Sequence, residues 1–478
     1  MDRPNVVVIV SDDQGYGDLS CMGATDFRTP RLDALARSGV RFSSFYANSP
    51  VCSPSRASLL SGRYPGNAGV RNILMGYRTT PGLPANVPTL ATALKQEGYQ
   101  TGLVGKWHLG AAEGSRPNDH GFDESFGHLA GAFDYYSHLI WSAANREIVV
   151  NGKKGIGFLV HDLWENGQEV WHDGHYSTDL FGERAVQYIR RAAGREDPFF
   201  LYVGFNAPHH PMHAPEQYKE RFPDLPPDRR IMAAMVSAMD DQIGAMMDEL
   251  ERQGVRENTI VFFMSDNGPS RQSRNRLDGT LDPYYGGSTG KMKGHKFSLF
   301  DGGIRVPSML SWPAQIPAGQ VVDEVAVAMD IFPTVLRAVG GDPTTYELDG
   351  LDLTPMLTEG AASPHDELFW ELGVQTAVRR GRWKLVLNGQ LIQEEPRPDP
   401  VFLADLQADL AESRNLAGEQ PEIVADLRGA AERWRQGIEA RWEREHAARM
   451  TGEMSYAVTD SSAMRVYDNP NNPALGDT

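Results

Sequence analysis

Residues 6–13 read Val6-Val7-Val8-Ile9-Val10-Ser11-Asp12-Asp13, five apolar residues followed by a serine and two carboxylates. A short, uninterrupted apolar run is typical of a parallel β-strand that is buried on both faces. Residues 101–104, 199–205 and 260–264 share this character. Amphipathic segments of helical length lie between the runs, at residues 30–39, 89–98, 177–193 and 230–254. This alternation predicts an α/β fold built on a parallel sheet.

Polar residues directly follow each of the four apolar runs. The segments are Ser11-Asp12-Asp13, Gly105-Lys106-Trp107-His108, Asn206-Ala207-Pro208-His209 and Ser265-Asp266-Asn267-Gly268. In open α/β sheets, ligands bind at the carboxyl ends of the strands. We therefore expect these segments to meet at one edge of the sheet and to form a site there.

The character of the sequence changes after about residue 340. Residues 375–387 and 401–406 have the composition of strands, and residues 421–450 repeat apolar side chains at helical spacing. We predict a large α/β domain over residues 1–345 and a smaller α+β subdomain over residues 346–450, with a short antiparallel sheet and a long helix. Residues 451–478 are polar and aperiodic, as expected for a tail or for an arm that packs on a neighbour.

The overall charge argues against one class of partner. The chain carries 63 acidic and 46 basic residues, a formal net charge of −17, whereas a nucleic-acid-binding surface is basic. The residues before Val6 leave no room for a signal peptide, and no apolar run approaches the roughly 18 residues of a membrane helix. We expect a cytoplasmic protein with no nucleic-acid or membrane partner. The sequence leaves open whether the chain forms a homo-oligomer, and the tail is the one feature that suggests association.

The two cysteines of the chain are too few for a disulfide framework. Cys52 precedes a predicted helix, with Ser53 as N-cap, Pro54 in the first helical position and Gly62 at the end. The free N–H groups and the dipole of such a helix start favour an anion beside Cys52. An ordinary buried thiol is the simpler alternative for a lone cysteine, and it is our prediction for Cys21.

The wider segment around Cys52 decides between these alternatives. Residues 52–63 match the pattern Cys-x-Pro-x-Arg followed by Leu-x-Ser-Gly-Arg. This pattern resembles the signature of the type I, formylglycine-dependent sulfatases, an arylsulfatase-like family of the alkaline-phosphatase-like superfamily. Residues 5–17, 29–42, 105–110, 207–211, 265–268 and 302–307 resemble further segments of that family. The resemblance implies a large mixed, mostly parallel sheet sandwiched by helices, and oxidation of Cys52 to Cα-formylglycine by a formylglycine-generating enzyme.

The resemblance also implies a cation site. Asp12, Asp13, Asp266 and Asn267 would hold one divalent cation together with the formylglycine at position 52. These side chains offer oxygen ligands, which Ca²⁺ and Mg²⁺ prefer; we favour Ca²⁺ and keep Mg²⁺ as the alternative. Taken singly, the two N-terminal aspartates could cap a helix, and Asp-Asn-Gly is also a common turn.

Sulfate-ester hydrolysis needs a nucleophile, charge compensation and an acid for the departing alcohol. In the reaction that the resemblance implies, a hydroxyl of hydrated formylglycine 52 attacks sulfur and forms a covalent sulfo-enzyme, and Arg56 favours the alkoxide. His108 is the base that lets this adduct collapse, and Lys106 bridges the hydrate and the sulfate. His209 and a second lysine bind sulfate and protonate the leaving oxygen.

Three lysines are candidates for this second position, Lys291, Lys293 and Lys296. The family spacing favours Lys296, five residues before Asp301, which stands where the family commonly has glutamate. For Lys291 and Lys293 we predict a solvated basic loop.

The sequence does not choose between aryl and carbohydrate sulfates. Residues 133–171 are rich in aromatic side chains, among them Tyr135, Trp164 and Trp171, which would line the alcohol side of the pocket or pack under a long loop. One alternative function is that of a phosphodiesterase or phosphonate monoester hydrolase of the same superfamily. The other is a sulfated-ligand-binding protein without catalysis. Lys106-Trp107-His108 and Lys296 favour the sulfatase.

Overall fold

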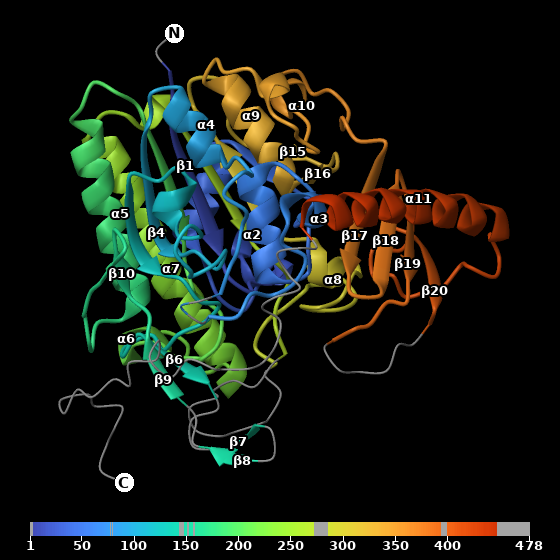
Figure 1. The fold of residues 1–478 in the computed structure, drawn as a ribbon, viewed down its shortest axis with the longest axis horizontal. Coiled ribbons are helices and arrows are strands. Elements are labelled where there is room, and N and C mark those ends of the chain that lie inside the picture. The colour runs from blue at the N-terminus through green and yellow to red at the C-terminus, as the bar shows by residue number, and fades with distance from the viewer. Residues whose placement is uncertain are drawn as a thin grey trace.

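The computed structural model describes residues 3–76, 78, 80–142, 148–150, 153–155, 158–271, 285–392 and 399–446. The predicted tail, residues 451–478, lies outside the described residues. A large sheet with the strand order β11-β10-β5-β4-β12-β1-β13-β14-β2-β15 forms the centre of the molecule, and a smaller sheet and a long helix lie beside it (Figure 1).

The four predicted apolar runs form adjacent strands of the large sheet. They are β1 (Asn5–Ser11), β4 (Gln100–Lys106), β12 (Phe199–Gly204) and β13 (Thr259–Ser265). Together with β5 (Glu124–His128), they pair in parallel in the order β5-β4-β12-β1-β13. Their carboxyl ends therefore lie along one edge of the sheet, as predicted.

Antiparallel strands complete both sides of this parallel centre. On one side β14 (Ser308–Ser311) pairs antiparallel with β13 and with β2 (Val40–Phe42), and β15 (Gln320–Val322) is parallel to β2. On the other side β10 (Trp164–Glu165) pairs antiparallel with β5 and with β11 (Gln168–Glu169). The sheet is mixed with a parallel centre, which confirms the predicted α/β class.

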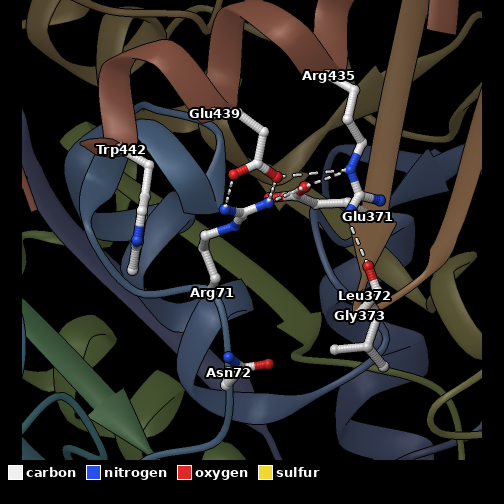
Figure 2. A pocket seen from close by; sticks show the side chains of 8 residues that line it. All are labelled: Arg71, Asn72, Glu371, Leu372, Gly373, Arg435, Glu439 and Trp442. Atoms are coloured by element: carbon white, nitrogen blue, oxygen red, sulfur yellow. Dashed lines mark hydrogen bonds and ion pairs between the residues drawn. The ribbon is translucent and has the colours of Figure 1, made fainter. Parts of the chain in front are cut away.

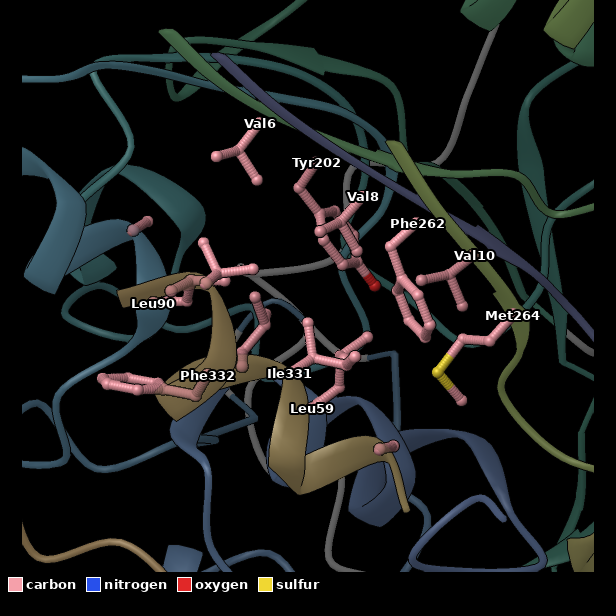
Figure 3. Packing of buried hydrophobic residues seen from close by; sticks show 14 of the residues in the cluster. Val6, Val8, Val10, Leu59, Leu90, Tyr202, Phe262, Met264, Ile331 and Phe332 are labelled. Atoms are coloured by element: carbon pink, nitrogen blue, oxygen red, sulfur yellow. The ribbon is translucent and has the colours of Figure 1, made fainter. Parts of the chain in front are cut away.

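Alternate residues of β1 pack against different helices. Val6, Val8 and Val10 share a buried cluster with α2 (Cys52–Ser61), α4 (Leu90–Gln96) and α9 (Ile331–Ala338), as Figure 3 shows. Val7 and Ile9 share another with α1 (Pro30–Arg37), α5 (Ser177–Ala193) and α7 (Pro227–Arg252). Because consecutive strand residues face opposite sides, a continuous apolar run is needed where helices cover both faces. Each such side chain contributes about 1.5–3 kcal/mol on burial.

The smaller sheet comes from the C-terminal part of the chain. It has the antiparallel order β17-β18-β19-β20, with bounds Glu367–Leu372, Gln375–Arg380, Trp383–Leu387 and Val401–Asp405. Helix α11 (Pro421–Glu445) packs on β18 and β19. The predicted segment 375–387 is two strands rather than one, because Gly381 turns the chain with a φ of 54°. The boundaries at residues 345 and 450 stay predictions.

Short elements connect these layers. The remaining helices are α3 (Pro65–Ala68), α6 (Glu216–Lys219), α8 (Asp301–Ile304) and α10 (Thr354–Thr358). The 3₁₀ turns are η1 (Tyr16–Asp18), η2 (Ser20–Met22), η3 (Pro117–His120), η4 (Arg256–Asn258), η5 (Ala328–Asp330) and η6 (Pro343–Thr345). Two-stranded sheets pair β3 (Phe45–Tyr46) with β16 (Ala326–Val327), β6 (Leu139–Ser142) with β9 (Phe158–His161), and β7 (Ile148–Val150) with β8 (Lys153–Gly155). No helix in the described part of the chain has the length and apolar composition needed to cross a membrane.

Candidate active site

The carboxyl ends of β1 and its neighbours bring the predicted site residues together. The backbone N–H of Asp12 donates to the carbonyl of Ala207 after β12, at 3.1 Å, and the N–H of Asp266 donates to the carbonyl of Ser11 at 3.0 Å. Asp13 has a φ of 58°, a left-handed conformation that aspartate adopts more readily than most residues. The turn after β1 is thereby tied to the turns after β12 and β13.

Helix α2 carries Cys52 into this group. Cys52 is its first residue and Val51 its N-cap, so our prediction that Ser53 caps the helix is wrong. The Ser53 hydroxyl instead accepts a hydrogen bond from the N–H of Leu74 at 3.1 Å. The helix ends, as predicted, at Gly62 with a φ of 68°. Cys52 is buried, and its burial raises the pKa of the thiol to about 12.

Four potential ligand atoms converge at the start of α2. One atom each from Asp12, Asp13, Cys52 and His209 lie within 4.8 Å of one another. The Sγ atom of Cys52 marks the position where a formylglycine would place its oxygens. Asp266 joins this group through its Oδ1 atom, which accepts from the N–H of Asp13 at 3.2 Å.

The oxygen donors fit a hard divalent cation. Oδ1 of Asp12 and Oδ1 of Asn267 are buried and accept no hydrogen bond in the part of the chain that the structure describes. Leaving such atoms unmatched is costly, and a cation would satisfy both. Burial, the largest cause, also raises the pKa of Asp13 and of Asp266, and a nearby cation would offset that desolvation.

Each carboxylate of the group is paired with a basic side chain. Lys106 Nζ lies 2.6 Å from Asp12, Lys296 Nζ lies 2.7 Å from Asp13, and Arg56 Nη2 lies 2.8 Å from Asp266. All six side chains are buried. The charges of the three carboxylates and the three basic side chains cancel. A bound divalent metal ion would therefore give the site a positive charge that attracts an anionic ester.

Two buried histidines complete the site. His108 donates from Nε2 to the carbonyl of Leu74 at 3.0 Å, which leaves Nδ1 as its basic nitrogen. His209 donates from Nδ1 to the carbonyl of His210 at 2.7 Å, and its Nε2 accepts from Lys296 Nζ at 3.2 Å. Burial, reinforced by neighbouring positive charges, holds the pKa of both imidazoles well below 6.5. Both rings are therefore neutral at pH 7.

Lys296 differs from the two lysines that precede it. Lys296 is buried against Asp13, whereas Lys291 is exposed. Lys293 points its ammonium group at the rings of Phe300 and Phe402, 4.6 Å and 3.9 Å from their centroids. The structure thus brings Lys296 into the cluster and places the other two elsewhere, although the loop around Lys291 and Lys293 is not simply solvated.

The C-terminal part of the chain holds the loop that carries Lys296. Phe297, with a φ of 74°, accepts a hydrogen bond on its carbonyl from Gln375 Nε2 at 2.8 Å. Lys384 Nζ, on β19, lies 2.6 Å from Asp301 and 3.1 Å from Glu412, and all three side chains are buried. Asp301, which stands where the family commonly has glutamate, is therefore a structural ion-pair residue on the far side of the loop.

Two tyrosines support the site; sequence reasoning missed Tyr202 and gave Tyr135 only as an aromatic residue that lines the pocket or packs under a loop. Tyr202, on β12, lies with its hydroxyl 3.3 Å from Arg56 Nη1. The Tyr135 hydroxyl lies 2.8 Å from the carbonyl of Asn206 and 2.9 Å from that of His209, so this residue braces the His209 turn. Trp164 is also buried and so has a packing role, whereas Trp171 is 49% exposed. Cys21, predicted to be buried, is only partly so, although its pKa is raised to about 12, chiefly by desolvation.

A pocket of about 360 Å³ lies between the segment at Arg71 and helix α11. Figure 2 shows the carboxylates of Glu371 and Glu439 around the Arg71 guanidinium, with distances of 2.6 Å to each, and Arg435 next to them. Because these charges compensate one another, the pocket offers no strong attraction for sulfate. Its lining contains none of the residues predicted for catalysis or for the cation.

Comparison with known proteins identifies the family. The sequence model of the Sulfatase family matches residues 4–341. N-acetylgalactosamine-6-sulfatase of Rattus norvegicus is 34% identical over 406 residues, which cover 80% of this chain and 71% of that protein. Arylsulfatase G of Canis lupus familiaris is 34% identical over 451 residues, which cover 86% of this chain and 81% of that protein.

A solved structure leads to the same family. The structure of Ps i-CgsB in complex with k-i-k-neocarrahexaose superimposes with a TM-score of 0.77 and 30% identity, covering 91% of this chain and 93% of that one. This chain belongs to the sulfatase family and is a sulfuric ester hydrolase.

Proposed function

We propose that this enzyme hydrolyses sulfate esters of carbohydrates through a covalent sulfo-enzyme formed at residue 52, after oxidation of Cys52 to formylglycine. The observation that carries the proposal is the position of Cys52: it begins α2 within 4.8 Å of ligand atoms of Asp12, Asp13 and His209. Arg56 and Lys106 contact two of the surrounding carboxylates.

Each buried side chain has a role that its contacts support. Lys106 and Lys296 place ammonium groups beside the position of the sulfate oxygens and offset their charge. Neutral His108, with Nδ1 as its basic nitrogen, accepts a proton in the step that releases sulfate. Lys296 and His209 share one hydrogen bond, and together they bind sulfate and deliver a proton to the leaving alcohol.

Asp12, Asp13, Asp266 and Asn267 would hold a divalent cation, for which we favour Ca²⁺ over Mg²⁺ because all four are oxygen donors. When present, the formylglycine hydrate supplies the nucleophile and the cation supplies a Lewis acid beside it. A sulfate monoester has one negative charge, which the positive charge of the site would attract once the cation is bound.

Carbohydrate sulfates are favoured over aryl sulfates by the names of two relatives. An N-acetylgalactosamine-6-sulfatase is among the relatives, and Ps i-CgsB was solved in complex with k-i-k-neocarrahexaose. The arylsulfatase relative leaves simple aryl sulfates as test substrates. The acidic net charge of −17 favours short saccharides over long sulfated polymers.

Two measurements test the proposal. The first is the turnover of sulfated mono- and oligosaccharides, nitrophenyl sulfate, a nitrophenyl phosphodiester and a phosphonate monoester. We expect the saccharide sulfates to give the highest kcat/KM. Faster cleavage of the phosphorus esters would overturn the assignment, and binding without turnover in a fully oxidised preparation would favour a sulfated-ligand-binding protein.

The second measurement tests the nucleophile. Intact-peptide mass spectrometry over residues 47–63 should show formylglycine at position 52 in active enzyme. The variant Cys52→Ser should trap one sulfate per chain and lose multiple turnover, since serine has no second hydroxyl to expel the sulfate. Cys21→Ser is the matched control and should keep its turnover. Unmodified Cys52 throughout an active preparation would refute the mechanism.

A further inference from the structure

A second group of potential metal ligands lies outside the predicted site. One atom each from His138, His161 and Asp173 lie within 4.8 Å of one another. His138 and His161 are buried and Asp173 is partly buried. The group is brought together by the pairing of β6 with β9, in which Leu139 lies opposite His161. Asp173 comes from the segment that leads into α5.

Each histidine of this group is held by its other ring nitrogen. His138 donates from Nε2 to the carbonyl of His175 at 3.1 Å. His161 donates from Nδ1 to Oε1 of Glu169 at 3.0 Å, and Arg78 fixes that carboxylate at 2.7 Å. Metal-binding histidines almost always donate their second N–H to a carbonyl or a carboxylate, which sets the tautomer and orients the ring. Both histidines show this pattern, one with each type of acceptor.

Because one ring nitrogen of each histidine donates to an oxygen, the other ring nitrogen carries the lone pair. In His138 that nitrogen is Nδ1, which is buried and accepts no hydrogen bond within the described residues. The side chain is 0% exposed, so water does not compensate. His138 also has a φ of 57°, a conformation that costs free energy and tends to persist where a fixed geometry serves a function.

We propose that His138, His161 and Asp173 bind a second metal ion, a borderline cation of the Zn²⁺ type, with a coordination position left for water or another ligand. Two imidazoles and one carboxylate suit Zn²⁺ and disfavour Ca²⁺, which takes oxygen ligands only. The proposed site therefore differs in chemistry from the oxygen-rich group at Asp12 and Asp13.

The surroundings of the site suit a bound ion. The Trp171 ring stacks on His161 with centroids 3.6 Å apart and 22° between the planes, so one of the proposed ligands lies against an aromatic ring. An ion here would tie the β6–β9 hairpin to the segment before α5. Tetrahedral nitrogen and oxygen ligands at about 2.0–2.2 Å from an ion lie about 3.4 Å apart, so the three atoms, which lie within 4.8 Å of one another, need to approach by at most about 1.5 Å.

The test is metal binding by the full chain, produced without a histidine tag, stripped with a chelator and kept in excess Ca²⁺. Titration calorimetry with Zn²⁺, and absorption spectroscopy with Co²⁺ as its substitute, should show a nitrogen-ligated site that survives the Ca²⁺. His161→Gln and Asp173→Asn should each weaken Zn²⁺ binding by at least about 100-fold, and Glu169→Gln by about 10- to 100-fold. Because the readout is binding, it does not depend on sulfatase activity.

His175→Gln is the matched control, because His175 contacts the site through its backbone carbonyl and should keep the Zn²⁺ affinity. Asp173→Asn is the mildest variant, since Asp173 is only partly buried; equal melting temperatures in chelator would show that the fold is intact. These substitutions would not change any binding of Zn²⁺ at the Cys52 site. The proposal is overturned if Zn²⁺ binding is absent, or if it is the same in wild type, His161→Gln and Asp173→Asn.

Discussion

Lys296 Nζ lies 2.7 Å from Oδ1 and 2.8 Å from Oδ2 of Asp13, although 283 positions separate the two residues. Both side chains are buried, and the same ammonium group donates to Nε2 of His209. Lys296 therefore links the cation group to the side of the site where the alcohol would leave. A buried charge that loses its partner costs about 3–5 kcal/mol, so neither member of the pair is replaceable without consequence.

Removing this ammonium group should slow turnover strongly. We expect Lys296→Met to lower kcat by about 10²–10³-fold at saturating cation, the usual loss when one charge-stabilising group is deleted. Lys293→Met is the control, because Lys293 lies over two aromatic rings and its loss should cost only about 0.5–1 kcal/mol of stability.

The same variant should respond more strongly to Ca²⁺. With Lys296 gone, Asp13 keeps an uncompensated charge, so the gain in melting temperature on adding Ca²⁺ should exceed that of wild type. Steady-state kinetics and thermal melts with and without Ca²⁺ check both results. Equal kcat for Lys296→Met and Lys293→Met would refute the role given to Lys296.

The central fold was predictable because its strands are apolar on both faces. Because the Val6–Val10 run has no polar residue, neither face of this strand suits contact with water, and helices had to cover both. The polar residues after each run had to meet at one edge of the sheet. These inferences need only local patterns and the rule for strand ends. The choice of Lys296 among three lysines rested instead on the spacing that the resemblance to the sulfatase family implies.

Features that depend on distant contacts were not predictable. Strand β17 begins at Glu367 and carries Glu371, and these charges obscure its pattern. Glu371 is buried in ion pairs with Arg71 and Arg435, which come from other segments. The start of α2 shifted to Cys52 because the Ser53 hydroxyl bonds to Leu74 instead of capping the helix. The tautomers of His108, His138 and His161 depend on acceptors from other segments.

Removal of the divalent cation should abolish activity. Chelation and dialysis should reduce turnover to background, and Ca²⁺ should restore it; Mg²⁺ is the alternative that the same titration examines. Cation at about 100 times its Kd should stabilise the fold by about 2.7 kcal/mol, seen as a higher melting temperature. Asp12→Asn should weaken this response, because Asp12 Oδ1 is one of the unmatched oxygens. Full activity in chelator would exclude a required cation.

The ion pairs beneath the Lys296 loop should contribute to both stability and turnover. Lys384→Met leaves Asp301 and Glu412 without their shared cation, and we expect a loss of about 3–5 kcal/mol in the free energy of unfolding, measured with urea. The Lys219–Glu216 pair at the surface supplies the control, since solvent screens it and Lys219→Met should change the free energy of unfolding far less.

A milder change should separate positioning from stability. Gln375→Ala removes the shorter of the two hydrogen bonds that the Phe297 carbonyl accepts, the longer coming from Gln390, and should lower kcat more than it raises KM, because Lys296 would shift while the rest of the site stays in place. Asn388→Ala, which removes a 3.3 Å bond to the exposed Val374 carbonyl, should leave both constants unchanged. Identical kinetics of the Gln375 and Asn388 variants would contradict a positioning role.

The pKa of His108 predicts the acid side of the pH profile. A general base must be unprotonated, and burial together with Lys106 holds the pKa of this imidazole well below 6.5. The kcat set by His108 should therefore stay level as pH falls from 8 through 6.5 and decline only near the depressed pKa. His108→Gln can still donate to the carbonyl of Leu74. It should lower kcat by about 10²–10⁴-fold and remove the decline of kcat at low pH.

The free energy of unfolding should also depend on the protonation of His108, and the direction of this dependence follows from the lowered pKa. Below pH 6.5 the unfolded chain binds a proton at His108 that the folded chain does not, so the stabilisation present above that pH is lost as the pH falls toward the depressed pKa. The free energy of unfolding should therefore drop less between pH 7 and pH 5 in His108→Gln than in wild type. An acid limb in kcat centred at or above 6.5, together with equal pH dependence of unfolding in the two proteins, would show that His108 titrates as an ordinary exposed histidine and is not the base.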